Sequence, residues 1–303
     1  MSSQRDIAHS IYRRLLNRAR KNNEDFNYTL NRYGVERFLY RLSISPYAKQ
    51  FVLKGASLLF VWKGRNYRVT RDIDLLGYKT ADIKNIFKDI SSIVCQQDDS
   101  IHFMPESVKA ENIRDNTDYG GLNVSIDAIL LNAKIALRID IGFGDVIKPE
   151  PEIISYPVLL DMPRPQLRAY NRETFIAEKF EAMVHLGIAN SRLKDFYDIW
   201  LLSRFFDFSA AKLTASIENT FKRRRTEIPK GKPFIFTSEF YNDLQKQTQW
   251  KTFIRKTRAE NAPAEFSAVI KEIDDFFMPL LRILNNPSQA KIVWIKGKGW
   301  RES

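Results

Sequence analysis

The stretch that decides the fold of this chain is Arg68-Val69-Thr70-Arg71-Asp72-Ile73-Asp74-Leu75-Leu76. It places two carboxylates two residues apart in an apolar run. Side chains two apart in a strand share a face, so we expect Asp72 and Asp74, with Thr70, opposite a core-facing Ile73 and Leu75. Two like charges beside a core are costly unless a cation lies between them, and carboxylate oxygens suit Mg²⁺ or Mn²⁺. The stretch therefore predicts a metal-binding strand; a solvated strand face or turn is the alternative.

The composition indicates a soluble, globular protein. The chain has 303 residues, 44% of them hydrophobic and 28% charged, enough for one large domain or two modest ones. No apolar run approaches the length of a membrane-spanning helix, and the N-terminus has no signal-peptide core. Cys95 is the single cysteine, which fits a reducing cytoplasm, and three scattered histidines argue against a zinc site.

The net charge of +12 favours polyanionic partners, above all nucleic acid. The alternative is that the excess charge only keeps the protein soluble. Nucleotide chemistry is supported by other residues, so we expect contact with nucleic acid and none with a membrane.

The first half of the chain reads as mixed α/β. Helical periodicity and apolar alternation predict, in order, helices over 5–21 and 29–42, a strand over 51–53, a helix over 56–62, the Asp72/Asp74 strand, a helix over 80–94, a short strand near 101–103, and strands over 122–130 and 133–141 joined by a turn at Asn132. Residues 98–120 otherwise carry no clear pattern.

The second half reads as helical. Prolines concentrate in residues 148–165, which indicates a domain boundary. We therefore expect a mixed-sheet domain over 1–150 and a helical domain over 151–303. The expected helices cover 172–187, 192–206, 209–223, 238–256 and 263–284.

A third carboxylate can join the Asp72/Asp74 pair. In Leu137-Arg138-Ile139-Asp140-Ile141 the isoleucines face one way and Asp140 the other. Three carboxylates on neighbouring strands would complete a site for two metals, which polarises a phosphoryl oxygen and activates a hydroxyl. Asp127 is a competing third ligand of lower rank, and Asp145 could be a turn residue.

Lys54-Gly55-Ala56-Ser57 lies between an expected strand and an expected helix. Backbone N–H groups at a helix start bind phosphate readily, so this loop could hold a nucleotide. A glycine before a helix is common, and Ser57 could equally be a helix cap.

Lys179 falls within an apolar helical stripe, where a lysine usually meets an anion or extends to the surface. Asp195 and Asp198 flank the core stripe of the next helix. One interpretation is a buried Lys179–Asp195 ion pair that braces two helices. The other is a lysine that grips a triphosphate, with Asp195 or Asp198 orienting it or the acceptor. Spacing alone leaves both open.

Several motifs together resemble the AbiEii/AbiGii nucleotidyltransferase toxin family, which includes the MenT toxins. The resemblance runs from about residue 5 to residue 225, and its motifs are Tyr33–Leu42, Phe51–Ala56, Thr70–Gly77, Arg138–Asp145, Glu173–Lys179 and Asn190–Asp198.

The resemblance implies an α/β (α+β) fold with a DNA-polymerase-β-like nucleotidyltransferase core, followed by a helical C-terminal domain. It implies the toxin of a toxin–antitoxin pair, with a cognate antitoxin protein as partner. It also implies Mg²⁺-dependent transfer of nucleotides from an NTP to the 3′ end of tRNA, which blocks aminoacylation and translation.

Carried over by position, the resemblance makes Asp72, Asp74 and Asp140 metal ligands and brings Lys179 to the triphosphate. Asp195 matches the family's helical acidic residue, and Asp198 lies in the same motif. Thr70 matches a hydroxyl position where phosphorylation could silence the enzyme. Lys54, Gly55 and Ser57 belong to the nucleotide loop, whose usual Gly-Gly or Gly-Ser pair is here Gly55-Ala56. Ser57 could replace the missing polar contact.

Two basic segments remain. Lys222-Arg223-Arg224-Arg225 ends an expected helix, where cations favour the helix dipole, or it could grip an RNA backbone. Trp294, Lys296, Lys298, Trp300 and Arg301 interleave aromatic and basic residues as RNA-binding surfaces do, although a terminal strand with a Gly297/Gly299 turn is preferred.

The sequence thus predicts an NTP:RNA nucleotidyltransferase. Nucleotidylation or phosphorylation of a protein with the same site is the nearest alternative. A non-catalytic RNA-binding module is the second, and the intact set of Asp72, Asp74, Asp140 and Lys179 argues against it.

Overall fold

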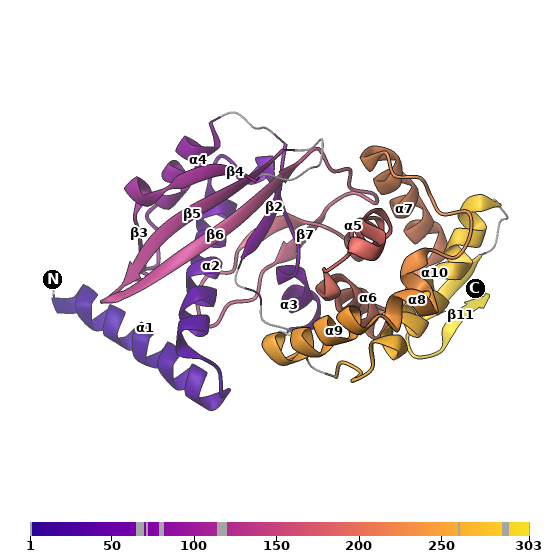
Figure 1. Cartoon of the computed structure of the whole chain (residues 1–303). Helices are drawn as coiled ribbons and strands as arrows, with labels where there is room; N and C mark the ends of the chain where they lie inside the picture. Colours follow the sequence, from indigo (N-terminus) through magenta and orange to yellow (C-terminus); the bar gives the residue numbers. More distant parts are fainter. Residues whose placement is uncertain are drawn as a thin grey trace. The chain divides into compact units, whose positions relative to one another are not determined.

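The computed structural model describes residues 2–64, 70, 72–78, 82–113, 120–259, 261–286 and 291–302. These form two compact units (Figure 1). The first contains the described residues up to Gly144 together with Glu152–Ala169, and the second contains Asp145–Pro151 and the described residues from Tyr170 onward. The chain crosses between the units more than once, so the division does not follow one cut at residue 150.

The first unit is α/β. Its helices are α1 (Ser2–Lys21), α2 (Phe26–Ile44), α3 (Ser57–Lys63) and α4 (Ile83–Ser91), with 3-10 turns η1 (Ala48–Gln50) and η2 (Pro105–Ser107). Its strands are β1 (Phe51–Lys54), β2 (Ile73–Gly77), β3 (His102–Phe103), β4 (Lys109–Ile113), β5 (Gly121–Leu130), β6 (Ala133–Phe143), β7 (Glu152–Ser155) and β8 (Gln166–Ala169).

These strands form one eight-stranded mixed sheet. The order is β3-β5-β6-β2-β1-β8-β7, and β4 pairs with β5 beside β3. The β2/β6 and β1/β8 pairs are parallel, and the remaining pairs are antiparallel. The expected mixed α/β fold with a mixed sheet is therefore confirmed.

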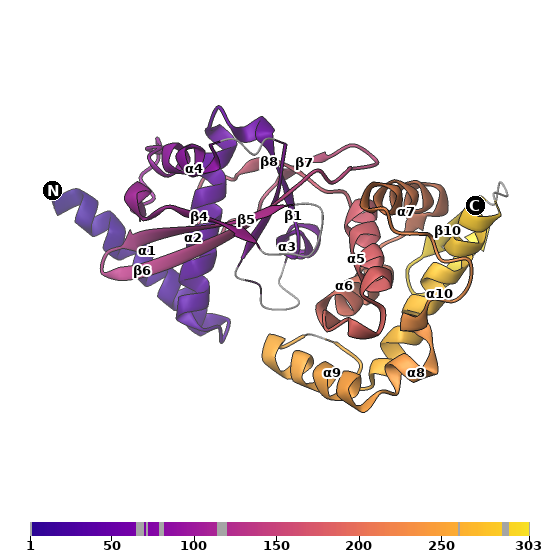
Figure 2. The ribbon, with the colours of Figure 1, turned by 45° about the horizontal axis from the view of Figure 1, so that its top comes forward.

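One face of the sheet carries the apolar core. Ile73 and Leu75 of β2 and Ile139 and Ile141 of β6 are at most 1% exposed, as the alternation of the two strands predicts. Helix α2 lies against β6 and β8, and α1 packs on α2 (Figure 2). Asp74 and Asp140 lie between these core residues and therefore on the opposite face of the sheet, although Leu76 on that face of β2 is also buried.

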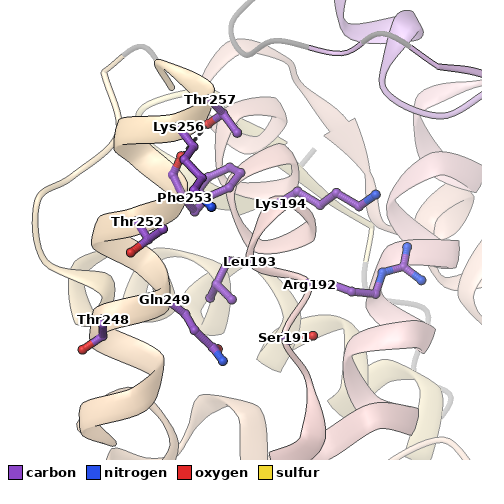
Figure 3. A pocket seen from close by; sticks show the side chains of 10 residues that line it. All are labelled: Ser191, Arg192, Leu193, Lys194, Thr248, Gln249, Thr252, Phe253, Lys256 and Thr257. Atoms are coloured by element: carbon purple, nitrogen blue, oxygen red, sulfur yellow. Dashed lines mark hydrogen bonds between the residues drawn. The ribbon is translucent and has the colours of Figure 1, made fainter.

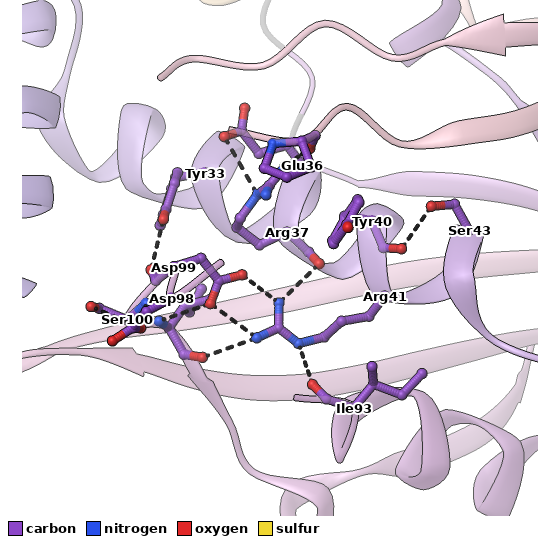
Figure 4. A network of polar contacts seen from close by, with 12 residues as sticks. Tyr33, Glu36, Arg37, Tyr40, Arg41, Ser43, Ile93, Asp98, Asp99 and Ser100 are labelled. Carbon is purple, nitrogen blue, oxygen red and sulfur yellow. Dashed lines mark hydrogen bonds and ion pairs between the residues drawn. The ribbon is translucent and has the colours of Figure 1, made fainter. Parts of the chain in front are cut away.

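Buried polar side chains tie α2 to its surroundings (Figure 4). Arg41 donates to both carboxylate oxygens of Asp99, at 2.7 and 3.1 Å, and to the carbonyl of Ile93. The Tyr33 hydroxyl donates to the carbonyl of Asp99 at 2.7 Å. This pairing satisfies charges that would be costly to bury alone, and it fixes the loop around Asp99 on the helix.

The proline-rich stretch, expected as a domain boundary, belongs in part to the first unit. β8 pairs in parallel with β1, and β7 pairs with β8. Between these strands, the carbonyl of Pro163 accepts a bond from Arg37 at 2.7 Å, and the Leu159 N–H donates to Glu36 at 2.7 Å. Backbone pairing and these α2 contacts hold residues 152–169 on the sheet.

The second unit is mainly helical, as expected. Its helices are α5 (Arg172–Leu186), α6 (Leu193–Phe205), α7 (Ala210–Arg224), α8 (Ser238–Tyr241), α9 (Leu244–Thr257) and α10 (Phe266–Asn285), with turns η3 (Gly187–Ala189) and η4 (Phe234–Phe236). Helix α5 packs on α6 and α7, and α10 packs on both of these. The helix expected over 238–256 is interrupted because Asp243 caps α9 by accepting from the Lys246 N–H.

The C-terminal segment is structural. β10 (Ile292–Ile295) and β11 (Gly299–Glu302) form a hairpin that pairs with β9 (Phe208–Ser209). Trp294 and Trp300 both pack on Phe276, at ring-centroid distances of 4.9 and 5.7 Å, and each indole N–H donates to a backbone carbonyl. The terminal strand with a turn, the preferred interpretation of this segment, is therefore confirmed. The two indole rings pack within the protein, which does not support the alternative that they stack on RNA bases.

Among the described residues, no helix is long and apolar enough to cross a membrane.

Candidate active site

A row of polar side chains crosses the open face of the sheet in the first unit. Lys54 on β1 is the register partner of Asp74 on β2, and Asp74 is the partner of Asp140 on β6. Asp140 is in turn the partner of Asn123 on β5. Side chains of directly opposed residues lie about 5 Å apart at Cβ and point to the same face. The register therefore assembles Lys54, Asp74, Asp140 and Asn123 into one continuous row.

The carboxylate of Asp140 is oriented by its neighbour. Asn123 Nδ2 donates to Asp140 Oδ1 at 2.6 Å, and Asn123 is opposed on its other side by Glu111 of the edge strand β4. The sequence did not identify Asn123 or Glu111, because only the pairing of β4 with β5 and β5 with β6 places them in the row. Alternation along 122–130 was the available signal, since it puts Asn123 on the face of Asp140.

Gly55 provides the space for Asp74. Its φ is +71°, a conformation that side chains rarely adopt, and a Cβ on Gly55 would lie 1.9 Å from Asp74 Oδ2. Lys54 extends across the row, because a Cβ on Gly142 of β6 would be 3.2 Å from Lys54 Nζ. The ammonium group thus lies over β6, two residues from Asp140, where it counters the negative charge of the row.

The other residues of the nucleotide loop lie next to this row. Ser57 is the first residue of α3, is 5% exposed, and donates through its hydroxyl to the Lys54 carbonyl at 3.3 Å. Thr70 is partly exposed and Asp72 is exposed, and both precede β2. Residues 65–69 and residue 71 lie outside the described residues, and they include Arg68, Val69 and Arg71 of the opening motif.

Asp127, the lower-ranked alternative ligand, lies away from the row. It is four residues beyond Asn123 on β5, about 13 Å at 3.3 Å per residue. Its carboxylate pairs with Lys134 at 2.9 Å. This location makes Asp127 a suitable control residue on the same sheet.

The donor chemistry of the row suits a divalent cation. Asp74 and Asp140 offer carboxylate oxygens from adjacent strands, the ligand type that Mg²⁺ and Mn²⁺ prefer. Within the described parts of the chain, no group of three or more His, Cys, Asp or Glu side chains is arranged to hold a metal ion. The fit to a metal thus rests on the Asp74/Asp140 pair alone, and Asp72 is not gathered with it into a three-carboxylate cluster.

The second unit contains the predicted lysine–aspartate group. Lys179 Nζ on α5 lies 2.6 Å from Asp195 Oδ1 and 2.9 Å from Asp198 Oδ2, both on α6. Lys179 is 8% exposed and both aspartates are fully buried. The buried Lys179–Asp195 ion pair, one of the two interpretations that the sequence left open, is therefore present, and Asp198 takes part in it as well. The same contacts hold the Lys179 ammonium in one position, which a triphosphate-binding role also requires.

Arg192 is a further member of this group that the sequence did not identify. Its Nε lies 2.8 Å from Asp195 Oδ2, so Asp195 bridges Arg192 and Lys179. The guanidinium side chain is 47% exposed, unlike Lys179. The i, i+3 spacing of Arg192 and Asp195 was the available signal.

Arg224, in the basic segment at the end of α7, contacts carboxylates within the second unit. It forms ion pairs with Asp145, Glu178 and Glu181, at 3.1, 2.8 and 2.8 Å. Asp145 is therefore an ion-pair partner of Arg224 and not only a turn residue. Arg224 therefore has a structural role, but through ion pairs with three carboxylates and not through the expected interaction with the helix dipole.

The first unit combines a mixed sheet that carries carboxylates on adjacent strands with a glycine loop before a helix, and the second unit is mainly helical. The family model described as nucleotidyl transferase AbiEii toxin, type IV TA system, matches residues 37–276. The chain belongs to this family of nucleotidyltransferase toxins, and a toxin of such a system implies a cognate antitoxin. Among curated proteins, none matches the chain.

Three solved structures are similar to this chain at low identity. One is a putative nucleotidyltransferase from H. pylori, at 14% identity and a TM-score of 0.47, covering 84% of this chain and 94% of that one. JHP933 from Helicobacter pylori has 13% identity and a TM-score of 0.44, covering 83% and 88%. MenT4, a nucleotidyltransferase toxin from Mycobacterium tuberculosis, has 12% identity and a TM-score of 0.49, covering 92% and 99%.

Proposed function

We propose that this protein transfers nucleotides from an NTP to the 3′ end of tRNA, so that the tRNA is no longer aminoacylated and translation stops. The family establishes a nucleotidyltransferase toxin, and a nucleotidyltransferase takes an NTP. The RNA acceptor is supported by the net charge of +12, which favours a polyanion over a protein of ordinary charge.

The observation that carries the catalytic part is the in-register pair of Asp74 and Asp140. Two carboxylates side by side on adjacent strands repel each other, and that cost is offset when a divalent cation binds between them. Lys54 and Asn123 complete the row on either side. Such an arrangement suits phosphoryl transfer, because a metal ion and a lysine can stabilise the negative charge that gathers on the transferred group.

In this proposal Asp74 and Asp140 would hold Mg²⁺ or Mn²⁺. The family resemblance adds Asp72 as the third ligand, which would have to approach the pair when the metal binds, because the structure does not gather the three carboxylates. A bound divalent cation supplies Lewis-acid polarisation of the phosphoryl oxygens and charge neutralisation. Lys54, Gly55, Ser57 and Thr70 line the nucleotide. The small Gly55-Ala56 pair lets the loop backbone come close to the phosphates, and the Ser57 hydroxyl can leave the Lys54 carbonyl to contact them.

The reaction forms a bond between the 3′-hydroxyl oxygen of the RNA and the α-phosphorus of the NTP. The bond from that phosphorus to the bridging oxygen breaks, and pyrophosphate leaves with the electron pair. The hydroxyl proton passes to a carboxylate, for which Asp140 is suited because Asn123 fixes its orientation.

Lys179 is carried over from the family resemblance as the residue that contacts the triphosphate. Asp195 and Asp198 hold its ammonium group, at 2.6 and 2.9 Å, and act as positioning residues. Two carboxylates of α6 thus fix the position of the ammonium group, and a residue that contacts a triphosphate needs such a fixed position. We expect both aspartates to contribute to positioning Lys179. Arg192 in turn holds the Asp195 carboxylate through its ion pair.

The test incubates purified protein with total tRNA, Mg²⁺ and each α-labelled NTP in turn. We compare wild type with Asp140→Asn and with Asp127→Asn, a matched change on the same sheet but outside the row. We expect label on tRNA from wild type and Asp127→Asn, and at least about a hundredfold less from Asp140→Asn. Circular dichroism checks that both variants are folded.

Each other outcome overturns part of the proposal. Label on a protein band and none on RNA would favour the protein-modifying alternative. No label on either acceptor would favour an RNA-binding module. Equal loss in Asp140→Asn and Asp127→Asn would show that the row has no special role.

A further inference from the structure

The second unit contains a pocket that has no part in the reaction proposed above. It has a volume of about 510 Å³ and lies between the start of α6 and one side of α9 (Figure 3). This volume lies within the roughly 300–1,000 Å³ range of small-molecule sites and is large enough for a nucleotide. The lining residues are Ser191, Arg192, Leu193 and Lys194 from the α6 side and Thr248, Gln249, Thr252, Phe253, Lys256 and Thr257 from α9.

The charged side chains of this pocket are all positive. Arg192, Lys194 and Lys256 line it from two helices, and all three are exposed. Among the described residues that line it, there is no carboxylate. A rim with three cations suits an anion that carries several charges, such as the phosphodiesters of a nucleic-acid strand.

The remaining lining suits an aromatic base. Leu193 is buried and Phe253 is half-buried, and the Phe253 ring is supported by Trp250 and Tyr197 at centroid distances of 5.4 and 5.8 Å. Gln249 Oε1 is buried and has no hydrogen-bond partner in the part of the chain that the structure describes. An unpartnered buried acceptor is costly, and the exocyclic amine of a base would satisfy it once the Gln249 side chain turns toward the pocket.

Arg192 connects the pocket to the lysine–aspartate group of the same unit. It lines the pocket and also lies 2.8 Å from Asp195 Oδ2, while Asp195 holds Lys179. A ligand phosphate at Arg192 would therefore be linked, through the Asp195 carboxylate, to Lys179, the lysine proposed to contact the triphosphate.

We propose that this pocket binds one nucleotide of the single-stranded end of the RNA acceptor. The base lies against Phe253 and Leu193, and the flanking phosphates lie at Lys194, Lys256 and Arg192. The inference rests on the proposed function, since it assumes an RNA acceptor. A strand fits better than a free NTP, because a triphosphate usually brings a divalent cation and no lining residue is a carboxylate.

The test measures binding of a fluorescent single-stranded RNA by anisotropy, without NTP, over a range of salt concentrations. Lys194→Gln/Lys256→Gln removes two rim charges. Lys251→Gln/Arg255→Gln removes two charges from exposed residues of α9 that do not line the pocket. The controls thus match the net charge of the test variant. Phe253→Leu keeps an apolar side chain and removes the ring.

We expect the rim variant to bind RNA about tenfold or more weakly at low salt. The slope of log K against log salt should fall by about 0.7 for each lost phosphate contact. The control double variant should change affinity less than about threefold. Phe253→Leu should weaken binding about fivefold with an unchanged slope, because stacking involves no counterion release.

The opposing results are distinct. Equal effects of the two double variants would overturn the pocket and leave only general electrostatic attraction. Weaker ATP, CTP, GTP or UTP binding in the rim variant, with unchanged RNA binding, would make it an NTP site instead. Normal RNA labelling with unchanged RNA binding in all variants would overturn this inference alone, whereas no RNA binding by wild type would overturn the RNA acceptor as well.

Discussion

At the scale of single residues, the row on the sheet shows which part of a site a sequence can specify. The faces of Asp74 and Asp140 follow from alternation, because each lies between isoleucines or leucines that enter the core. Their alignment with each other, and with Lys54 and Asn123, depends on strand register. Register is fixed by the packing of residues far apart in the chain, so no local pattern predicts it.

Gly55 should be required for the position of Asp74. Gly55→Ala adds a Cβ that would meet Asp74 Oδ2, and we expect transfer to fall about a hundredfold, as for a small misplacement of a reacting group. Gly64→Ala is the matched control, since Gly64 has the same φ of +71° and nothing within 4 Å of the added Cβ. Both should lose about 1 kcal/mol of unfolding free energy or more, but Gly64→Ala should keep its activity. Equal loss of activity would contradict the role of Gly55.

Glu36 should make stability depend on pH. Burial raises the pKa of Glu36 from 4.5 to about 8, only partly countered by Arg37 and the Leu159 N–H. Between these two values the folded protein keeps a proton that the unfolded chain releases. The contribution of Glu36 to the unfolding free energy is therefore full below about pH 4.5 and falls as pH rises towards 8, by at most about 1.4 kcal/mol per unit.

Urea unfolding of wild type and Glu36→Gln at several pH values checks this linkage. The variant removes the titration and keeps an acceptor for the Leu159 N–H. We expect the wild type to lose stability relative to Glu36→Gln as pH rises from 5 to 8. Parallel curves over this range would show that Glu36 does not titrate there.

At the scale of elements, the long periodic helices, the β5–β6 hairpin and the short strands β1 and β3 were predictable, whereas β4, β7 and β8 were not. β4 reads Lys-Ala-Glu-Asn-Ile, is largely exposed, and owes its conformation to backbone pairing with β5. β7 and β8 lie in a proline-rich stretch that reads as a linker, yet β8 pairs with β1. β4 and β7 are edge strands, which need little apolar surface, so composition gives no signal for them. β8 lies between β1 and β7, and its four residues are too few to show a pattern.

The pair of helices α5 and α6 should depend on the charge of Lys179. Lys179→Met leaves two fully buried aspartates, Asp195 and Asp198, without that cation. We expect a loss of about 3–5 kcal/mol of unfolding free energy, as for other buried pairs that lose one partner. Lys179→Arg keeps the charge and should lose less than half as much.

Denaturant unfolding of the two Lys179 variants, beside the transfer assay, separates stability from function. The Lys179→Arg protein should fold and yet transfer nucleotides poorly, because a planar guanidinium does not reproduce a point charge held between two carboxylates. A stable and fully active Lys179→Met protein would remove Lys179 from both roles.

At the scale of the whole molecule, excess positive charge extends beyond the family match of residues 37–276. Helix α1 buries Ala8, Ile11, Leu15 and Ala19 and exposes a basic side. Its exposed cations are Arg5, Arg13, Arg14, Arg18, Arg20 and Lys21. Amphipathic periodicity predicts such a face, but the sequence does not show which molecule it attracts.

The dependence of transfer on salt should distinguish an RNA acceptor from a protein. A polyanion bound through several phosphates releases counterions, so kcat/KM for tRNA should fall at least about tenfold between 50 and 200 mM salt. The kcat/KM for NTP, measured with saturating tRNA, should change less than about threefold, because few charges are then exchanged with solvent. A protein acceptor of ordinary charge would give a weak dependence for both substrates. Equal, shallow slopes for tRNA and NTP would therefore mean that the +12 charge serves solubility and not substrate binding.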